Sequence, residues 1–222
     1  GPMPAEALQV IRSVAAERGA PLSVWGVDFE GYGESGSFRY RGHREMGGLV
    51  CGLSGDHQVV NAAVALRMLE VGGFAVVDEA LRQGLAGVRH PGRLEWLASD
   101  LLVDGAHNPD GANALSAYLA TLSWDRRRVL LLGGGRDKDI RSVAAALASQ
   151  VDRIYTTACD HPKARTPWEV ATELEGLPVP VSPAGPLADA VPFCRDNNTL
   201  VIVAGSLYLV GAVRDLVGAV PA

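Results

Sequence analysis

The sequence has 222 residues, of which 48% are hydrophobic and 20% are charged, a composition typical of a globular protein with a sizeable apolar core. Its net charge of -5 argues against a nucleic-acid-binding surface. No apolar run approaches the about 20 residues that a membrane-spanning helix needs, so no membrane association is expected. Three cysteines have spacings that fit neither a disulfide framework nor a zinc site, which favours a cytoplasmic protein and gives them no role: Cys51, Cys159 and Cys194.

The first 88 residues predict few elements for their length. Gly1 and Pro2 precede Met3 and are typical of a tag-cleavage scar, so they are left out of the fold prediction. Hydrophobic periodicity predicts helices over 4–18, 57–70 and 76–84. Alternating patterns predict strands over 22–28, 38–43 and 48–53, with the glycine-rich segment GYGESGS as a turn. We therefore expect this part to be the tail of a larger domain.

Polar residues gather on the first turn of the helix predicted from residue 57. His57 and Asn61 are four residues apart and share a face, with Gln58 beside them. Together they offer donors and acceptors that suit a flat heterocycle such as adenine. A polar helix start without any ligand would explain the same pattern.

After residue 84 the segment GLAGVRHPGR is rich in glycine, proline and arginine, which is typical of a linker, so we expect a domain boundary between residues 88 and 89. Beyond it, strands and helices alternate, which predicts a doubly wound, Rossmann-like α/β domain with a mostly parallel sheet. The predicted strands cover 94–103, 128–133, 152–157, 178–182 and 199–204. The predicted helices cover 109–122, 139–149, 167–175, 186–193 and 206–218.

The segment LLVDGAHNPDGA, residues 101–112, joins the end of a buried strand to a helix. Asp104, His107 and Asn108 follow the apolar run, at the carboxyl edge of the predicted sheet, where ligands of such folds bind. Asn108 is the predicted N-cap and Pro109 suits the first helical position. An ordinary strand-turn-helix, with capping Asp104 and Asn108 and a solvated His107, fits the pattern equally well.

Three further loops are predicted at the same edge of the sheet. GGGRDKD contains Arg136 and Lys138, which could hold a carboxylate or a phosphate or simply form a charged turn. It is neither a dinucleotide fingerprint nor a phosphate loop, and the chain contains no phosphate loop. ACDHPKART holds the second of the two lysines, Lys163, and AGSLYLVG begins a helix at Ser206, which could cap or bind an anion.

The order of these motifs is more specific than any one of them. HQVVNAA, HPGRLE, LLVDGAHNPDGA, GGGRDKD, HPKA and AGSLYLVG occur in that order, and the chain resembles the C-terminal half of folylpolyglutamate synthase and dihydrofolate synthase, of the Mur ligase superfamily. The resemblance implies a Rossmann-like C-terminal glutamate-ligase domain over 89–222. It implies that residues 1–88 are the tail of a central α/β ATPase domain.

The resemblance also implies an ATP-dependent ligase that forms an acyl phosphate on dihydropteroate or a folate and joins it to L-glutamate. The residues implied to bind ATP are His57, Gln58, Asn61, Arg93 and Asp104, with Asn61 on adenine, Arg93 on the phosphates and Asp104 on the ribose. The residues implied to bind glutamate are His107, Asn108, Lys138 and Ser206. Arg93, which would stabilise charge on the transferring phosphoryl group, and His107, which would orient glutamate, are implied to be catalytic.

The family's phosphate loop and Mg²⁺ ligands are missing from this sequence, so no metal site is expected in it. We therefore expect a truncated chain, monomeric like its family, that uses ATP and tetrahydrofolate or dihydropteroate only in a longer form and is inactive alone. Two other classes stay open: a stand-alone module that binds an adenine nucleotide or an amino acid, and another Mur-type amide ligase. A dehydrogenase is disfavoured by the missing glycine fingerprint.

Overall fold

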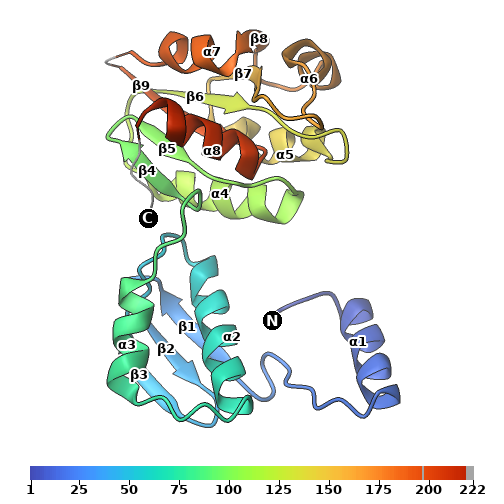
Figure 1. Cartoon of the computed structure of the whole chain (residues 1–222), viewed down its shortest axis with the longest axis vertical. Coiled ribbons are helices and arrows are strands. Elements are labelled where there is room, and N and C mark those ends of the chain that lie inside the picture. The colour runs from blue at the N-terminus through green and yellow to red at the C-terminus, as the bar shows by residue number, and fades with distance from the viewer. Residues whose placement is uncertain (197, 219–222) are drawn as a thin grey trace. The chain divides into compact units, whose positions relative to one another are not determined.

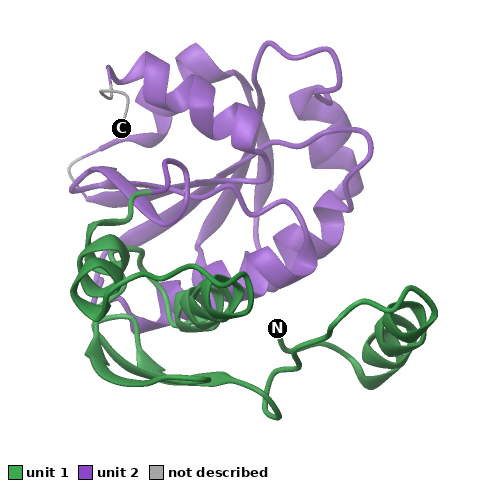
Figure 2. Ribbon diagram, turned by 60° about the horizontal axis from the view of Figure 1, so that its bottom comes forward, with its two compact units in different colours: residues 1–89 green, residues 90–222 purple. Residues whose placement is uncertain are grey.

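The computed structural model describes residues 1–196 and 198–218. The chain divides into two compact units, residues 1–89 and 90–222, which are coloured separately in Figure 2. This division lies one residue from the boundary predicted in the linker. None of the described helices has the length and apolar content that crossing a membrane requires.

Unit 2 is built on a six-stranded sheet in the order β4-β5-β9-β6-β7-β8 (Figure 1). Its strands are β4 (Glu95–Ala98), β5 (Leu101–Val103), β6 (Arg127–Leu132), β7 (Arg153–Ala158), β8 (Val181–Pro186) and β9 (Thr199–Ala204). Its helices are α4 (Pro109–Thr121), α5 (Ile140–Leu147), α6 (Pro167–Glu173), α7 (Leu187–Cys194) and α8 (Leu207–Leu216), with a 3-10 turn, η1 (Ala148–Gln150). All neighbouring strands from β5 to β8 pair in parallel, so the predicted doubly wound α/β fold is confirmed.

The central strands of unit 2 bury both faces. Successive side chains of a strand point to opposite faces, so Leu130 and Ile202 pack in a core with α4, α5 and α6. Leu131 and Val203 pack in a second core with α7 and α8. This two-sided burial explains why β6 and β9 are continuous apolar runs rather than alternating ones.

The single strand predicted over 94–103 is wrong. The structure has two antiparallel strands there, β4 and β5, with Ser99 and Asp100 in the turn between them. Asp100 anchors this turn: its carboxylate forms an ion pair with Arg195, and its carbonyl accepts a hydrogen bond from the Val201 amide at 2.9 Å. The sheet therefore has an antiparallel edge strand, β4, which the hydrophobic pattern of residues 94–103 did not predict.

Unit 1 has an antiparallel sheet of three strands, on which two of its three described helices, α2 and α3, pack. The strands are β1 (Glu30–Glu34), β2 (Ser37–Arg41) and β3 (Glu45–Leu49), and the helices are α1 (Ala5–Glu17), α2 (His57–Val71) and α3 (Asp78–Gly87). Helix α2 contacts β1, and α3 contacts β3. Their shared core includes Phe38, Tyr40, Leu49 and Leu66. Helix α1 buries none of its residues within the described structure, and Figure 1 shows it apart from the sheet.

The predicted strand over 22–28 is wrong, because this segment turns. Trp25 and Phe29 form an isolated bridge, with a turn over 26–28 between them. The Asp28 carboxylate closes the turn by accepting a hydrogen bond from the Val24 amide at 2.7 Å. Such local side-chain bonds compete with strand pairing.

The segment GYGESGS, predicted as a turn, is largely strand β1. Gly33 has a φ of +110°, and a Cβ at this position would lie 2.6 Å from the Ser37 carbonyl oxygen, so glycine is needed for β1 to pair with β2. The turn itself occupies residues 35–36. The strand predicted over 48–53 is displaced to Glu45–Leu49, because its register is fixed by the Arg41–Glu45 pair.

Candidate functional site

A cavity of about 380 Å³ lies at the carboxyl edge of the sheet in unit 2. Its lining comes from four parts of the chain: His107 after β5, residues 133–135, 137 and 138 after β6, residues 158, 159, 161, 163 and 164 from the end of β7 onward, and residues 205–209 after β9. Parallel strands bring their carboxyl ends to one edge, so segments far apart in sequence meet there. This edge is where the sequence predicted the chemistry.

Glycines form the floor of the cavity by letting backbones approach closely. Gly205 has a φ of +107°, and a Cβ on it would lie 2.2 Å from the Gly133 carbonyl oxygen. A Cβ on Gly133 would lie 2.5 Å from the carbonyl oxygen of Thr157. Glycine at these two positions therefore lets the chain after β6 and after β9 pack closely at the edge of the sheet where the cavity lies.

His107 is held in one orientation by a backbone contact. Its Nδ1 lies 2.8 Å from the carbonyl oxygen of Gly105. Because a carbonyl can only accept, Nδ1 carries the proton and donates, and the lone pair of the neutral ring is on Nε2. His107 lines the cavity, and Nε2 is its ring nitrogen outside this backbone contact.

Two ammonium groups and one carboxylate also line the cavity. Lys138 and Lys163 are both lining residues, and they are the two lysines of the sequence. Lys138 Nζ lies 3.4 Å from Asp137 Oδ2. A hydrogen bond from its own backbone amide, together with Lys138 and the more distant Lys163, holds the pKa of Asp137 below its usual value, so it is ionised at neutral pH.

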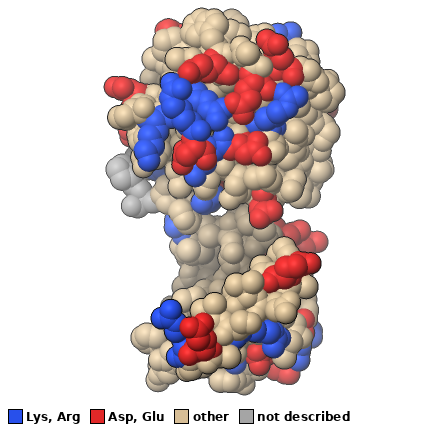
Figure 3. Space-filling model, turned by 90° about the vertical axis from the view of Figure 1, so that its right-hand side faces the viewer, with Lys and Arg blue, Asp and Glu red and all other residues tan. Residues whose placement is uncertain are grey.

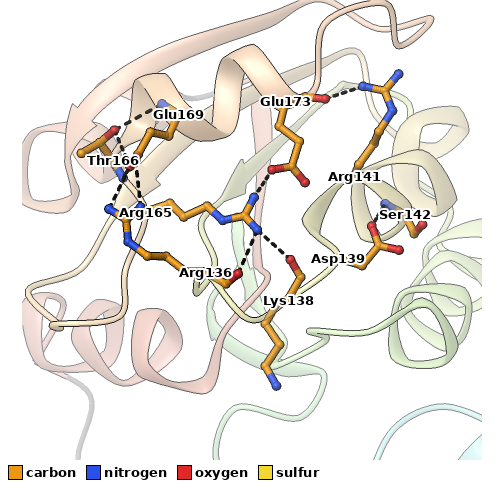
Figure 4. Close-up of polar contacts among 9 residues, drawn as sticks. All are labelled: Arg136, Lys138, Asp139, Arg141, Ser142, Arg165, Thr166, Glu169 and Glu173. Atoms are coloured by element: carbon orange, nitrogen blue, oxygen red, sulfur yellow. Dashed lines mark hydrogen bonds and ion pairs between the residues drawn. The ribbon is translucent and has the colours of Figure 1, made fainter.

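The arginines of these loops have structural roles. Arg165 forms an ion pair with Glu173 and donates to the carbonyl oxygens of Arg136 and Lys138 (Figure 4). Arg136 is exposed and donates to Glu169 at 3.0 Å. The hypothesis that Arg136 grips a ligand beside Lys138 is therefore not supported by its contacts. In Figure 4 the Lys138 amine points away from this arginine cluster.

The start of α8 brings to the cavity Ser206, which the sequence predicted, and Tyr208, which it did not single out. Ser206 Oγ accepts a hydrogen bond from the Tyr208 amide at 3.1 Å, so Ser206 is an N-cap and also a lining residue. The Tyr208 ring stacks on His161 with centroids 4.0 Å apart. Tyr208 and Cys159 also line the cavity, and burial raises the pKa of the Cys159 thiol. Tyr208 follows Ser206 by two residues at a helix start, which is the signal that could have indicated it.

Asp104 and Asn108 are not among the lining residues of this cavity. Asp104 is 6% exposed, and its carboxylate accepts hydrogen bonds from the Leu94 and Ala106 amides. Asn108 is the N-cap of α4, as predicted, because its Oδ1 accepts from the Gly111 amide at 2.8 Å.

Replacing Asn108 by Ala is expected to lower the free energy of unfolding by about 1 kcal/mol, because the Gly111 amide loses its partner. Urea unfolding of the two proteins measures this difference. Asn108→Asp retains the capping oxygen and is the matched control. An Asn108→Ala variant as stable as the parent would show that the cap contributes nothing.

The residues predicted to bind a nucleotide are found in both units. In unit 1, the Asn61 amide donates to Gln58 Oε1 at 2.9 Å, and Gln58 Nε2 donates to His57 Nε2 at 2.9 Å. Gln58 is buried, whereas Asn61 is exposed as a residue. In unit 2, Arg93 is half-buried within the turn that precedes β4.

Charges of both signs are mixed on the exposed surface. Figure 3 shows Lys and Arg beside Asp and Glu over the face of unit 2 that is turned to the viewer. Among residues 1–196 and 198–218, no group of three or more His, Cys, Asp or Glu is placed to hold a metal ion.

Residues 92–207 match the Mur ligase family in its glutamate ligase domain. The chain is 33% identical over 195 residues to a dihydrofolate synthase/folylpolyglutamate synthase of Mycobacterium tuberculosis, covering 76% of this chain and 40% of that protein. The crystal structure of Mycobacterium tuberculosis folylpolyglutamate synthase complexed with ADP and AMPPCP matches with a TM-score of 0.90 and 27% identity, covering 100% of this chain and 55% of that one.

The structure of Escherichia coli FolC in complex with DHPP and ADP matches with a TM-score of 0.85 and 27% identity, covering 95% of this chain and 51% of that one. The chain thus spans about half the length of these relatives. The resemblance to folylpolyglutamate synthase and dihydrofolate synthase that the motifs predicted is confirmed. The chain belongs to the Mur ligase family, and its residues 92–207 form the glutamate ligase domain of that family.

Proposed function

We propose that this chain is part of an ATP-dependent ligase that joins the amine of L-glutamate to the carboxylate of dihydropteroate or a folate through an acyl phosphate. The observation that carries the proposal is the cavity of unit 2, in which His107, Lys138 and Ser206 meet within the family's glutamate ligase domain. The cavity is the proposed site of glutamate.

The chemistry of the lining fits an amino acid with two carboxylates. Lys138 and Lys163 supply two positive charges, and Asp137 supplies one negative charge that suits an ammonium group. The amine of glutamate must present a lone pair to the carbonyl carbon of the acyl phosphate, where the new C–N bond forms as phosphate leaves. The acceptor Nε2 of His107 fits the role of orienting this amine and taking up its proton.

The nucleotide part of the proposal rests on Asn61 and Arg93. The carboxamide of Asn61, steadied by Gln58, has the donor and acceptor that pair with an adenine edge. Arg93 and Asp104 are proposed for the phosphates and the ribose. ATP, when bound, would supply the phosphoryl group that activates the carboxylate. We assign no metal ligand to this chain, and we propose that Mg²⁺ accompanies ATP in a monomeric cytoplasmic enzyme.

Replacing His107 by Ala is expected to lower kcat by roughly 10²-fold or more and to leave the KM for ATP nearly unchanged, because the amine loses its acceptor. The measurement is steady-state kinetics with ATP, L-glutamate and dihydropteroate or tetrahydrofolate, on the longest natural polypeptide that contains this chain. His43→Ala is the control, since His43 is an exposed residue of unit 1. Equal kcat values for His107→Ala and the parent would contradict the proposed role.

The acceptor substrate distinguishes this proposal from the other classes. Glutamate incorporation is expected with dihydropteroate or tetrahydrofolate and not with a UDP-linked muramoyl peptide. Incorporation only into the UDP-linked substrate would identify another Mur-type ligase. Tight binding of ATP or glutamate without incorporation into any acceptor would favour a binding module.

A further inference from the structure

Leu94 has an unusual backbone conformation. Its φ is +43°, and among residues 1–196 and 198–218 it is the one non-glycine residue with a positive φ. This left-handed region is unfavourable for a residue with a bulky side chain, so surrounding contacts must hold it. Leu94 directly follows Arg93 and directly precedes β4.

The contact that holds Leu94 comes from Asp104. The last pair of the β4–β5 ladder is Glu95 with Val103, so Leu94 and Asp104 stand opposite each other one step beyond it. There the Leu94 amide donates to Asp104 Oδ2 at 2.8 Å, and a side chain takes the place of a ladder carbonyl. The second oxygen, Oδ1, accepts from the Ala106 amide at 2.7 Å. One buried carboxylate thus joins two turns.

Other contacts fix the same turn on either side of Arg93. The Gly92 carbonyl oxygen accepts from the Gly105 amide at 2.7 Å, and the Gly92 amide donates to Glu95 Oε2 at 2.7 Å. The Leu94 side chain is 4% exposed and packs in the core of α4. Arg93 is therefore the half-buried residue between two anchored neighbours, and its backbone direction depends on both anchors.

We propose that Asp104 is a positioning residue: its carboxylate holds Leu94 in the left-handed conformation and thereby fixes the backbone from which the Arg93 side chain projects. The inference deepens the proposed function, because that function assigns the nucleotide phosphates to Arg93. It also gives the DGAHNP turn a role that does not need the ribose. A carboxylate suits this role because it accepts from two amides at once and donates to neither.

The test is nuclear magnetic resonance of the 222-residue chain with three variants: Asp104→Asn, Leu94→Gly, and both together. The amide of asparagine must face one of the two backbone donors, so hydrogen exchange at Leu94 or Ala106 is expected to accelerate roughly tenfold to a hundredfold in Asp104→Asn. The Cα and Cβ shifts of Leu94 are expected to leave their left-handed values, and those of Arg93 are expected to move with them.

The Leu94→Gly variant distinguishes a role of Asp104 in holding Leu94 at positive φ from a role in stabilising unit 2 as a whole. Glycine adopts positive φ without strain, so in the double variant the Arg93 shifts are expected to return toward those of Leu94→Gly alone. Asp152→Asn is the matched control, since Asp152 accepts from the Arg128 amide at 2.8 Å elsewhere in unit 2. It should accelerate exchange at Arg128 and leave Arg93 unchanged.

Unchanged Leu94 and Arg93 shifts in Asp104→Asn would overturn the proposal. An equal loss of protection at Leu94 and at Leu130 in β6 would also overturn it, because the carboxylate would then support the whole unit. Titration of ATP into the parent chain and into an Arg93→Ala variant keeps the two proposals apart. If the shifts respond as expected while Arg93→Ala binds ATP as well as the parent, the positioning role stands and the phosphate role of Arg93 fails.

Discussion

Replacing Glu70 by Ala is expected to lower the free energy of unfolding of unit 1 by about 3–5 kcal/mol, which is the usual cost of removing one partner from a buried charge cluster. Glu70 is near the end of α2, and its side chain is only 7% exposed. The effect is large because the same carboxylate serves donors from both the sheet and its own helix.

Four donors converge on Glu70. Its Oε2 accepts from the Tyr40 hydroxyl at 2.7 Å and from the His43 amide at 3.0 Å, and its Oε1 accepts from the Arg44 amide at 2.9 Å. Arg67, whose side chain is 10% exposed, donates to it at 3.1 Å. Alanine would leave the two buried donors, Tyr40 and Arg67, without this acceptor, which costs more than the bonds themselves contribute.

Hydrogen exchange measured by mass spectrometry on peptides of β2 and α2 reports the stability of unit 1 separately from unit 2. Asp78→Ala is the control, because the Asp78 carboxylate pairs with Arg44 but is 62% exposed, so its loss should cost less than about 1 kcal/mol. Similar costs for the two variants would contradict the interpretation of Glu70 as the centre of the unit.

The same cluster predicts a pH dependence. Burial alone would raise the pKa of Glu70, but hydrogen bonds from Tyr40, His43, Arg44 and Arg67 outweigh it and lower that pKa below its usual value of 4.5. A lowered folded-state pKa contributes stability above pH 4.5 that is lost as the pH falls through the folded value. In the Glu70→Gln variant, the free energy of unfolding of unit 1 should therefore fall less between pH 5 and pH 3 than it does in the parent. The same hydrogen-exchange experiment measures both proteins.

The fold of unit 2 was predictable because its strands are long apolar runs and its helices carry clear caps. Asn108 and Ser206 are capping residues in the structure, and β6, β7 and β9 lie within two residues of their predicted ranges. Unit 1 was harder to predict. The glycines of GYGESGS are typical of a turn, and only the pairing with β2 shows that Gly33 serves a strand. The pairing of residues 30–34 with residues 37–41 decided this, and the glycine content of the segment does not reveal that pairing.

The candidate site was predictable in part for the same reason. Parallel topology placed His107, Lys138 and Ser206 at one edge of the sheet, and the structure brings them to one cavity. The topology alone could not show that Arg165 forms an ion pair with Glu173, or that the Tyr208 ring stacks on His161. Those choices depend on side-chain packing across loops. The assignment of Asp104 to ribose and of Asn108 to glutamate stays a prediction.

Replacing Lys138 by Met is expected to weaken the binding of L-glutamate roughly 10- to 100-fold, because a charge-assisted contact to a carboxylate is lost. Lys163→Met is expected to have an effect of similar size, since both ammonium groups line the cavity. Lys138→Arg should rescue only part of the loss, because a planar guanidinium does not match a point charge at the same position. Arg136→Met is the matched control, because Arg136 is exposed and paired with Glu169.

The sequence makes this measurement unusually direct, because the two cavity lysines are its two lysines. Reductive methylation with ¹³C keeps their charge and gives two side-chain signals, apart from that of the terminal amine. Titration with L-glutamate should shift both signals, with the same affinity, and L-glutamine should shift one of them less because it lacks the second carboxylate. Arg136→Met should leave both shifts unchanged. If glutamate shifted neither signal in the parent, or shifted both just as much in a sample blocked at Cys159, which lines the cavity, the cavity would not be the glutamate site. A shift of one signal alone would assign the second carboxylate to another residue, and replacing the lysine whose signal does not shift should then leave glutamate binding unchanged.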